Sequence, residues 1–317
     1  MRETYDVVVV GGGAAGLSGA LALARARRSV LVVDAGAPRN APAGHVHNFL
    51  TRDGTPPAEL LAAGRAEVTG YGAEVVTGTV AAAERVDGGF RLALAGGGAV
   101  GARRLLVTTG LVDELPEVAG LAARWGRDVL HCPYCHGWEV RDQPIGVLAT
   151  GPLAVHQALL WRQWSADVTM FRHTAPAFGD EEQEQLAARD VAVVDGEVAA
   201  LEVADDRLTG VRLVSGLVVP RAALVVAPRF AARADLLTGL GLTAAPQEMG
   251  GHVIGTAVSA DASGATDVPG VWVAGNVADP RLQVIGAAAA GLNAGAMINA
   301  DLMAEDTRRA VAARRAG

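Results

Sequence analysis

The chain has 317 residues, half of them hydrophobic, with a formal net charge of -7 and an isoelectric point near 5.5. Such a length can form two domains of ordinary size around substantial cores. Nucleic-acid binding is disfavoured, because phosphate recognition needs clustered Lys and Arg and the one Arg-rich stretch is the C-terminal end. We expect no nucleic-acid partner.

The N-terminus runs directly into a strand pattern, without the basic region and cleavage site of a signal peptide. We therefore expect a cytoplasmic location. The most lipid-like segment, "VIGAAAAGLNAGAMINA", is rich in small residues and contains two Asn, which favours a tightly packed helix and no membrane partner. Two cysteines in so long a chain indicate redox or metal chemistry rather than a structural crosslink.

"YDVVVVGGGAAGLSGALALARARRSVLVVDAG" predicts a strand from Tyr5 to Val10, a helix over about residues 14–27 and a strand ending at Asp34. Gly11, Gly13 and Gly16 form GxGxxG, which permits a tight turn and close approach of the backbone to a pyrophosphate. An acid at the end of the second strand can accept hydrogen bonds from a ribose. The segment predicts a βαβ unit that binds a dinucleotide.

"TDVPGVWVAGNVADPRLQVIGAAAAG" predicts a turn, a buried strand from Val271 to Ala274 and a small-residue helix starting near Gln283. It resembles the C-terminal flavin motif of flavoprotein disulfide reductases with two dinucleotide domains. In that family an acid holds the ribityl chain where this chain has Asn276, which keeps a hydrogen-bonding side chain without the charge. The resemblance implies that the first dinucleotide is FAD.

Along essentially its whole length the chain resembles the low-molecular-weight thioredoxin reductases. The resemblance implies an α/β fold with two Rossmann-like dinucleotide-binding domains, in which an FAD domain (1–113 and 246–317) is split by an inserted NADPH-domain-like domain (114–245) that carries the cysteines. It also implies a homodimer. The predicted cofactor-binding set is Gly11, Gly13, Gly16, Asp34, Arg39, Asn48, Val80, Gly110, Gly275, Asn276, Gln283 and Val284.

The inserted domain has a damaged nicotinamide fingerprint. In "PIGVLATGPLAVHQALLWRQWSADVTMF", Ala149 replaces the first glycine, Gly151 keeps the second and Ala154 takes the third position. Pro152 removes an N–H that a pyrophosphate would use. Of the family's arginine-rich segment for a 2′-phosphate, only Arg172 and His173 remain, and "VVAPRFAARADL" replaces the turn that closes the nicotinamide site. NAD(P)H binding is therefore doubtful, and a diverged, looser site is the alternative.

"HCPYCHGWE" contains both cysteines, Cys132 and Cys135, and matches the CxxC of these reductases at a helix start, where a thiolate is favoured. The resemblance implies that Cys132 exchanges with substrate, that Cys135 lies nearer the flavin, and that His136 replaces an acid used in proton transfer. Zinc held by His131, the cysteines and His136 is the rival interpretation, which four ligands within six residues disfavour, so we predict no metal. His45 is an outside candidate for the substrate pocket.

An intact FAD fingerprint and CxxC beside an eroded nicotinamide fingerprint predict that electrons enter from a dithiol and leave through FAD to O2. "CPYCHGWE" resembles the flavin-dependent dithiol oxidases that close disulfides in natural products such as holomycin and gliotoxin. There a substrate thiolate attacks the oxidised pair, the second thiol resolves the mixed disulfide, and H2O2 is the reduced product. We therefore predict a small-molecule dithiol and O2 as partners.

Three alternatives stay open. An NAD(P)H-dependent thioredoxin or disulfide reductase would run electrons the other way and take a thioredoxin-like protein as its partner. A ferredoxin-fed reductase would need a basic docking patch, and the sequence shows none. A non-catalytic redox sensor would not turn over a dithiol at all.

Overall fold

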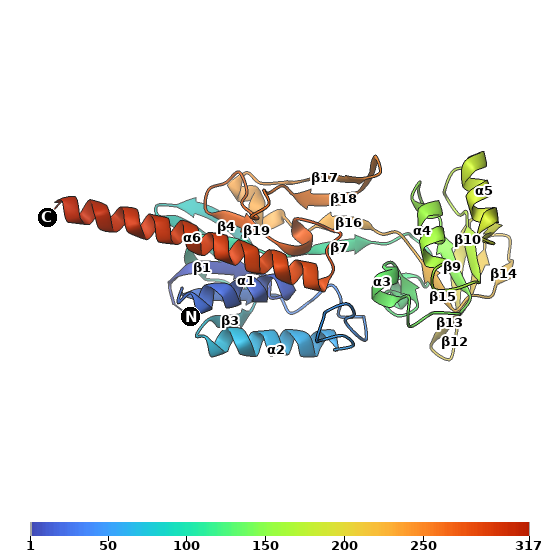
Figure 1. Cartoon of the computed structure of the whole chain (residues 1–317), viewed down its shortest axis with the longest axis horizontal. Helices are drawn as coiled ribbons and strands as arrows, with labels where there is room; N and C mark the ends of the chain where they lie inside the picture. Colours follow the sequence, from blue (N-terminus) through green and yellow to red (C-terminus); the bar gives the residue numbers. More distant parts are fainter. Residues whose placement is uncertain (1, 317) are drawn as a thin grey trace. The chain divides into compact units, whose positions relative to one another are not determined.

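The computed structural model describes residues 2–316, which form two compact units. The predicted domain ends at residues 1 and 317 lie outside the described part. Unit 1 comprises Met1–Ala41, Pro56–Val112 and Phe230–Gly317, and unit 2 comprises Pro42–Thr55 and Asp113–Arg229. Figure 1 labels the α-helices and most of the strands of both units.

This division differs from the predicted domains at two places. Unit 1 resumes at Phe230 rather than at residue 246, because the 3-10 helix η2 (Asp235–Leu240) buries Leu236 and Leu237 in the core of unit 1. The loop Pro42–Thr55, which the sequence assigns to the FAD domain, makes its contacts within unit 2. Neither difference is visible in the local sequence pattern, since both depend on packing.

A seven-stranded sheet forms the centre of unit 1, in the order β3-β2-β1-β6-β5-β4, with β19 also paired to β6. The pairs around β1 are parallel, with Val8 opposite both Leu31 and Leu105, whereas β4, β5 and β6 pair antiparallel. The bounds are β1 (Thr4–Val10), β2 (Val30–Asp34), β3 (Glu74–Thr77), β4 (Val80–Val86), β5 (Gly89–Leu94), β6 (Ala99–Val107) and β19 (Val271–Val273).

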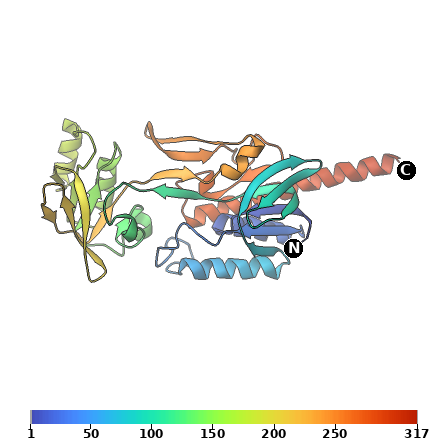
Figure 2. The same cartoon turned by 180° about the vertical axis from the view of Figure 1, so that it is seen from behind.

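The two faces of this sheet are covered differently. One face packs against the helices, which are α1 (Ala14–Arg25), α2 (Pro57–Gly70) and α6 (Val284–Ala316). On the other face, residues of the sheet, including its antiparallel strands β4 and β5, form a second core with Leu236 and Leu237 of η2, as the reverse view in Figure 2 helps to follow. Burial on both faces explains the unbroken valine run of β1, because a strand with no solvent-facing side needs no alternation.

Small residues let α6 lie directly on α1. A Cβ on Gly291 would overlap the carbonyl oxygen of Ala15, and one on Gly295 would come within 2.7 Å of the Gly19 oxygen. The lipid-like segment is thus a tightly packed helix, as its composition predicts. None of the helices that residues 2–316 form has both the length and the apolar character needed to cross a membrane.

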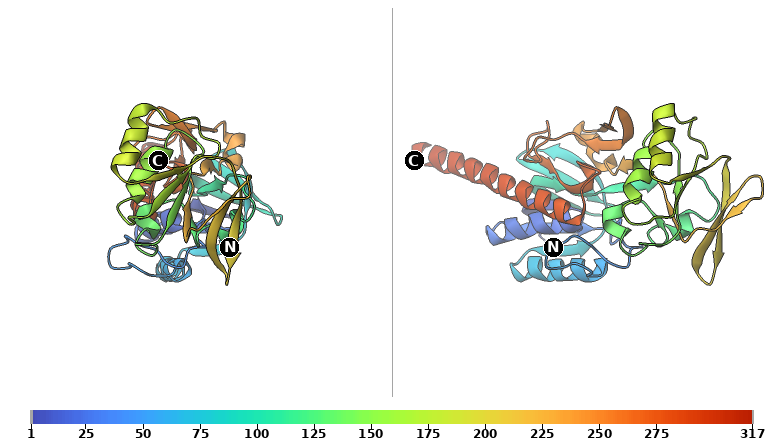
Figure 3. Two further views of the ribbon diagram at one scale, coloured as in Figure 1. Left: turned by 90° about the vertical axis from the view of Figure 1, so that its right-hand side faces the viewer. Right: turned by 45° about the vertical axis from the view of Figure 1, so that its right-hand side comes forward.

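Unit 2 is built on a five-stranded parallel sheet in the order β11-β10-β9-β15-β8. Helices α4 and α5 pack on one face, and a three-stranded antiparallel sheet, β12-β13-β14, packs on the other (Figure 3). The bounds are η1 (Ala122–Arg124), β8 (Val129–Leu130), α3 (Pro133–His136), β9 (Ile145–Leu148), α4 (Ala154–Trp161), β10 (Val168–Phe171), α5 (Asp180–Ala188), β11 (Ala192–Val194), β12 (Val198–Ala204), β13 (Arg207–Leu213), β14 (Val218–Val219) and β15 (Ala223–Val225).

Two strands carry the chain from one unit to the other. They belong to a four-stranded sheet in the order β17-β18-β16-β7, and the boundaries of the units fall inside β7 and β16. The remaining bounds are β7 (Leu111–Glu114), β16 (Arg229–Ala232), β17 (Ala244–Met249), β18 (His252–Val258) and η3 (Gly275–Val277).

Candidate active site

The first glycine turn of unit 1 has the geometry that the GxGxxG pattern predicts. Gly11 has a φ of +107°, and a Cβ there would lie 2.5 Å from the carbonyl oxygen of Thr108. A Cβ on Gly16 would overlap the oxygen of Gly11, so helix and strand meet with no room for a side chain. At Gly13 a Cβ would meet no protein atom within 4 Å, and no side chain caps the helix that follows. The N–H groups at this helix start therefore face open space, which suits a pyrophosphate.

Asp34, at the end of β2, is held by two donors. Its Oδ1 accepts a hydrogen bond of 3.1 Å from the N–H of Gly12, and its Oδ2 accepts one of 2.5 Å from Nη2 of Arg65 on α2. Both side chains line a cavity of about 620 Å³ within unit 1, together with Pro38, Leu61, Val75 and Thr77. A polar acid beside an apolar wall is what an adenosine needs. The turn and the cavity therefore fit a dinucleotide such as FAD.

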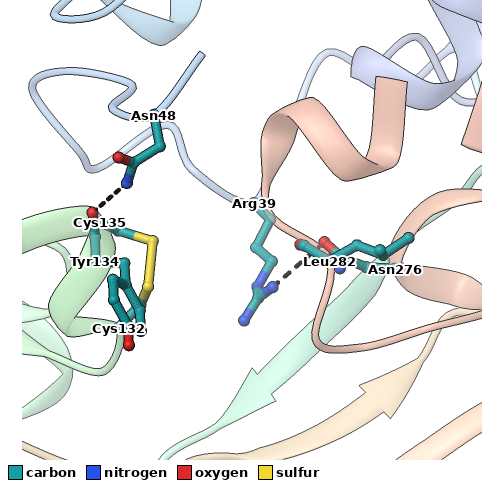
Figure 4. Close-up of a disulfide and its surroundings, with 7 residues drawn as sticks. All are labelled: Arg39, Asn48, Cys132, Tyr134, Cys135, Asn276 and Leu282. Atoms are coloured by element: carbon teal, nitrogen blue, oxygen red, sulfur yellow. Dashed lines mark hydrogen bonds between the residues drawn. A yellow bond between two sulfur atoms is a disulfide. The ribbon is translucent and has the colours of Figure 1, made fainter. Parts of the chain in front are cut away.

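The C-terminal motif of unit 1 is tied together by Asn276. Its Nδ2 donates to the carbonyl oxygens of Asp279 at 3.1 Å and Leu282 at 3.0 Å, and its Oδ1 accepts from Nη1 of Arg39 at 3.3 Å (Figure 4). The side chain thus shapes the loop that precedes α6. The sequence predicted only a contact with a ribityl chain and did not predict this structural role. Gly275, with a φ of +76°, starts η3.

The remaining predicted cofactor residues of unit 1 lie at strand and helix ends. Val80 begins β4 and is buried, whereas Gly110 follows β6 with a φ of +72°. Gln283 accepts the Ala287 N–H and so begins the first turn of α6, which includes Val284. Nothing in unit 1 contradicts their predicted role.

The second strand-turn-helix does not repeat the geometry of the first. Ala149 is fully buried at the end of β9, and neither it nor Gly151 has a positive φ. Ala154 is buried at the start of α4, so its methyl group fits where Gly16 of unit 1 has no space. The backbone of this turn therefore lacks the left-handed conformation that brings the first turn close to a pyrophosphate.

The two residues left of the 2′-phosphate segment both bind other groups of unit 2. Arg172 Nε lies 2.6 Å from a carboxylate oxygen of Asp195, and Nδ1 of His173 accepts a 3.0 Å hydrogen bond from the N–H of Val198. Burial lowers the pKa of His173 below its usual 6.5, although Glu197 opposes the shift. A neutral imidazole that accepts a backbone hydrogen bond offers no positive charge to a phosphate.

Cys132 and Cys135 are joined in a disulfide bond, with their Cα atoms 5.2 Å apart. Cys132 precedes α3 and Cys135 lies within it, so the predicted helix start is confirmed. The helix is one turn of four residues, and the macrodipole expected to favour the thiolate is correspondingly small. Nδ1 of His131 lies 3.0 Å from the carbonyl oxygen of Val226. Within residues 2–316 no three His, Cys, Asp or Glu side chains are grouped to hold a metal ion.

His136, directly after the second cysteine, is mostly buried and carries a lowered pKa. Burial is the main cause, Glu139 opposes it and His47 adds to it. The imidazole is therefore neutral at neutral pH and can accept a proton. His47 itself lies between two carboxylates, with Nε2 at 3.3 Å from Glu139 and Nδ1 at 3.4 Å from Asp53. His45 is exposed, with its ring centroid 6.1 Å from that of His47.

Asn48 has a partner that the resemblance did not predict. Its Nδ2 donates a 2.5 Å hydrogen bond to the carbonyl oxygen of Tyr134, which lies between the two cysteines (Figure 4). The predicted contact of Asn48 with the cofactor stays a prediction, whereas its contact with the CxxC turn is present within unit 2.

Sequence reasoning missed three residues that shape these sites. Arg65 holds Asp34, Thr108 donates through Oγ1 to the carbonyl of Gly11 at 2.8 Å, and Trp164 packs against the CxxC turn through Gly137. Each acts through a contact between segments far apart in the chain. No local motif identifies them.

Comparisons with known proteins agree with this geometry. The family model for pyridine nucleotide-disulphide oxidoreductases matches residues 5–296. "Thioredoxin reductase sirT" of Leptosphaeria maculans is 30% identical over 95% of this chain and 95% of its own length. The crystal structure of HlmI is 49% identical, with a TM-score of 0.91 over 100% of this chain and 99% of HlmI. An oxidoreductase from Agrobacterium tumefaciens is 36% identical, with a TM-score of 0.88 over 95% and 99% of the two chains.

The predicted fold class is confirmed by these matches and by the structure of a putative thioredoxin reductase TrxB from Bacillus anthracis, which is 27% identical with a TM-score of 0.88. Both Rossmann-like units that the sequence predicts are present, each with its parallel sheet and covering helices. The predicted resemblance to thioredoxin reductase-like flavoproteins is confirmed as well.

Proposed function

We propose that this chain, which belongs to the pyridine nucleotide-disulphide oxidoreductase family, is a dithiol oxidase. At the coarser level it is an FAD-dependent thiol–disulfide oxidoreductase of the thioredoxin reductase type. The proposed reaction takes two electrons and two protons from a small-molecule dithiol, which closes to an intramolecular disulfide. O2 receives them and becomes H2O2.

The observation that carries the direction is the state of the second nucleotide turn. Arg172 is paired with Asp195, His173 is neutral and bound to a backbone N–H, and Pro152 has no N–H to offer. A nicotinamide dinucleotide would lack the pyrophosphate turn of a Rossmann site, and the 2′-phosphate of NADPH would have to compete with Asp195 for Arg172. Electrons are therefore better supplied by the dithiol itself.

The chain's own residues can perform the thiol chemistry. In the oxidised protein a substrate thiolate attacks Cys132, which releases Cys135 as a thiolate. The second substrate thiol then attacks the mixed disulfide and releases Cys132. His136, neutral because burial lowers its pKa, accepts a proton in this exchange and passes it on.

Gly11, Gly13, Gly16 and Asp34 would hold the pyrophosphate and adenosine of FAD, and we propose the rest of the predicted set for its other parts. When bound, the flavin supplies a two-electron acceptor for the reduced cysteine pair and a donor for O2. The turn at Gly13 leaves open space for the cofactor. Asp34, which lines the cavity, accepts a hydrogen bond from Gly12 of the same turn.

The second candidate is an NAD(P)H-dependent thioredoxin or disulfide reductase. The names of several relatives favour it, among them "Thioredoxin reductase" of Streptomyces coelicolor, which is 30% identical over 67% of this chain. In that case a thioredoxin-like protein would take the place of the small dithiol. The same cysteines would serve, so only the source of the electrons separates the candidates.

The deciding experiment is anaerobic bleaching of the flavin. The purified holoenzyme is mixed separately with NADPH, NADH and dithiothreitol, and its visible absorbance is followed. The proposal expects rapid bleaching by the dithiol alone and formation of H2O2 when air enters. Rapid bleaching by NADPH would establish the reductase instead. A Cys135→Ser variant is the control, since it should resist bleaching by the dithiol.

A homodimer is the proposed assembly. Ile285, Leu292 and Met303 are 41%, 55% and 58% exposed and lie on one side of α6, because 18 residues make five helical turns. An apolar stripe of this kind suits a subunit contact. Sedimentation of Leu292→Glu tests it, since the variant should become monomeric.

The predicted cytoplasmic location stays a prediction.

A further inference from the structure

The CxxC turn is too short to hold its own shape. Helix α3 has four residues, and a single helical turn fixes several dihedral angles for few hydrogen bonds. Within the turn, the N–H groups of His136 and Gly137 reach the carbonyl oxygens of Cys132 and Pro133. The next carbonyl, that of Tyr134, lies beyond these bonds and needs a donor from elsewhere.

Asn48 supplies this donor from a loop 86 residues earlier in the chain. Its Nδ2 lies 2.5 Å from the Tyr134 oxygen. The loop Pro42–Thr55 is closed at its base by Val46, whose N–H donates to Thr55 at 2.9 Å, and it is therefore a structured support. Asn48 has a φ of +59°, a conformation that Asn tolerates better than most residues.

Asp53 orients this loop toward the turn. One carboxylate oxygen accepts the Asn48 N–H at 2.8 Å, and the other lies 3.4 Å from Nδ1 of His47. The opposite ring nitrogen of His47 lies 3.3 Å from Glu139, which follows the turn. The loop therefore contacts the segment around the disulfide at two points.

The turn also rests on Trp164. A Cβ on Gly137 would come within 2.8 Å of the indole ring, and the ring of Tyr134 meets it edge-on with centroids 5.6 Å apart. The N–H of Asp142 donates to the Trp164 carbonyl at 2.9 Å. Trp164 thus supports the turn through Gly137 and Tyr134, and the Asn48 amide holds the Tyr134 carbonyl.

From these contacts we infer that Asn48 is a positioning residue of the redox-active pair, whose amide holds the peptide between the cysteines in the shape of the disulfide form. The inference rests on the proposed function only in taking Cys132–Cys135 as the reacting pair. Without the amide, the exposed Tyr134 carbonyl of the oxidised form keeps only water as a donor. The reduced turn, free of the crosslink, loses less because it can change its shape. The disulfide of such a variant is easier to reduce.

The test is the redox equilibrium of the two cysteines, which are the only ones in the chain. Anaerobic holoenzyme is equilibrated in a series of glutathione buffers, and the reduced fraction is read by maleimide labelling and mass spectrometry. Asn48→Gly keeps the backbone conformation and removes the amide, whereas Asn48→Asp keeps the size and replaces the donor by a negatively charged acceptor. Both should shift the equilibrium toward the dithiol by about threefold to tenfold, the effect of one hydrogen bond.

The matched control is Asp205→Gly, an exposed residue of left-handed backbone in the β12–β13 turn. It should leave the equilibrium unchanged. Equilibria equal to that of the parent in both folded Asn48 variants would overturn the inference, and so would a shift in Asn48→Gly that Asn48→Asp lacks. If Asn48→Gly does not fold, Asn48→Asp carries the test alone. Bleaching of the parent flavin by NADPH would refute the oxidase and leave this result intact.

Discussion

Arg65 and Asp34, 31 residues apart in the chain, form a charged hydrogen bond of 2.5 Å at the edge of the cavity in unit 1. The side chain of Asp34 is 17% exposed and that of Arg65 is 38% exposed, so the pair is partly shielded from water. The acid is thereby held in one orientation before a ribose arrives. This arrangement leads to the first prediction.

Asp34→Ala should weaken FAD binding by about tenfold to a hundredfold, the effect of losing a hydrogen bond to a charged group. Arg65→Met should weaken it less, because the acid remains and keeps the Gly12 N–H as an orienting donor. Fluorescence quenching of FAD titrated with apoprotein measures both affinities. Arg25→Met, at the far end of α1, is the control and should bind as the parent does. Equal affinity in Asp34→Ala would remove Asp34 from the site.

Gly16→Ala and Gly13→Ala should fail for different reasons. The first places a Cβ against the carbonyl of Gly11 and should lower the free energy of unfolding by about 3 kcal/mol, since neither helix nor strand can yield. The second places a Cβ in open space, so the protein should fold and lose FAD. Urea unfolding and the flavin content of the purified variants separate these outcomes. A destabilised Gly13→Ala protein would contradict this account of the turn.

His136→Gln should slow the oxidation of a dithiol by about a hundredfold, the usual range for a proton-transferring residue. In the parent, burial lowers the pKa of His136, so the neutral ring persists below pH 6.5. The loss of rate caused by protonating this ring should begin below that value, apart from the loss of substrate thiolate that both proteins share at higher pH. Stopped-flow bleaching across pH measures this limb. His156→Gln, exposed on α4, should leave both rate and profile unchanged. A parent profile that shows no additional limb below pH 6.5, compared with His136→Gln, would argue against His136.

Acidification should destabilise the fold through His173. The folded-state pKa lies below 6.5, so the unfolded chain binds the proton more readily, and stability falls as pH drops below that value. Protonation also removes Nδ1 as the acceptor for the Val198 N–H. Melting temperatures between about pH 5 and pH 7 should therefore depend less on pH in His173→Ala than in the parent. Parallel curves for the two proteins would show that His173 makes no such contribution.

Cys132→Ser and Cys135→Ser should each reduce dithiol turnover by at least about a thousandfold, because each breaks the exchange. Their reactivities should differ. The free Cys132 in Cys135→Ser should form a mixed disulfide with an aromatic disulfide probe faster than the free Cys135 in Cys132→Ser. Mass spectrometry of the trapped adducts measures the two rates, and the reverse order would exchange the roles of the cysteines.

Local chemistry let the sequence determine the first βαβ unit and the position of the redox pair. The glycines at positions 11 and 16 follow from steric limits between adjacent segments. The two cysteines of a CxxC are close enough along the chain to form a disulfide within one turn. The sequence also predicted the loss of the second turn. Ala149 stands where the fingerprint has its first glycine, and Pro152 has no N–H to donate.

Tertiary structure alone decided which partners the polar side chains take. An amide such as that of Asn48 can bond to any nearby polar group, and its partner on Tyr134 is 86 residues away. The pairing of Arg172 with Asp195 likewise depends on β10 and β11 lying side by side. The residue type determines how many hydrogen bonds a side chain can donate and accept. Which partner it takes depends on how segments distant in the chain pack together, and no local sequence pattern shows that packing.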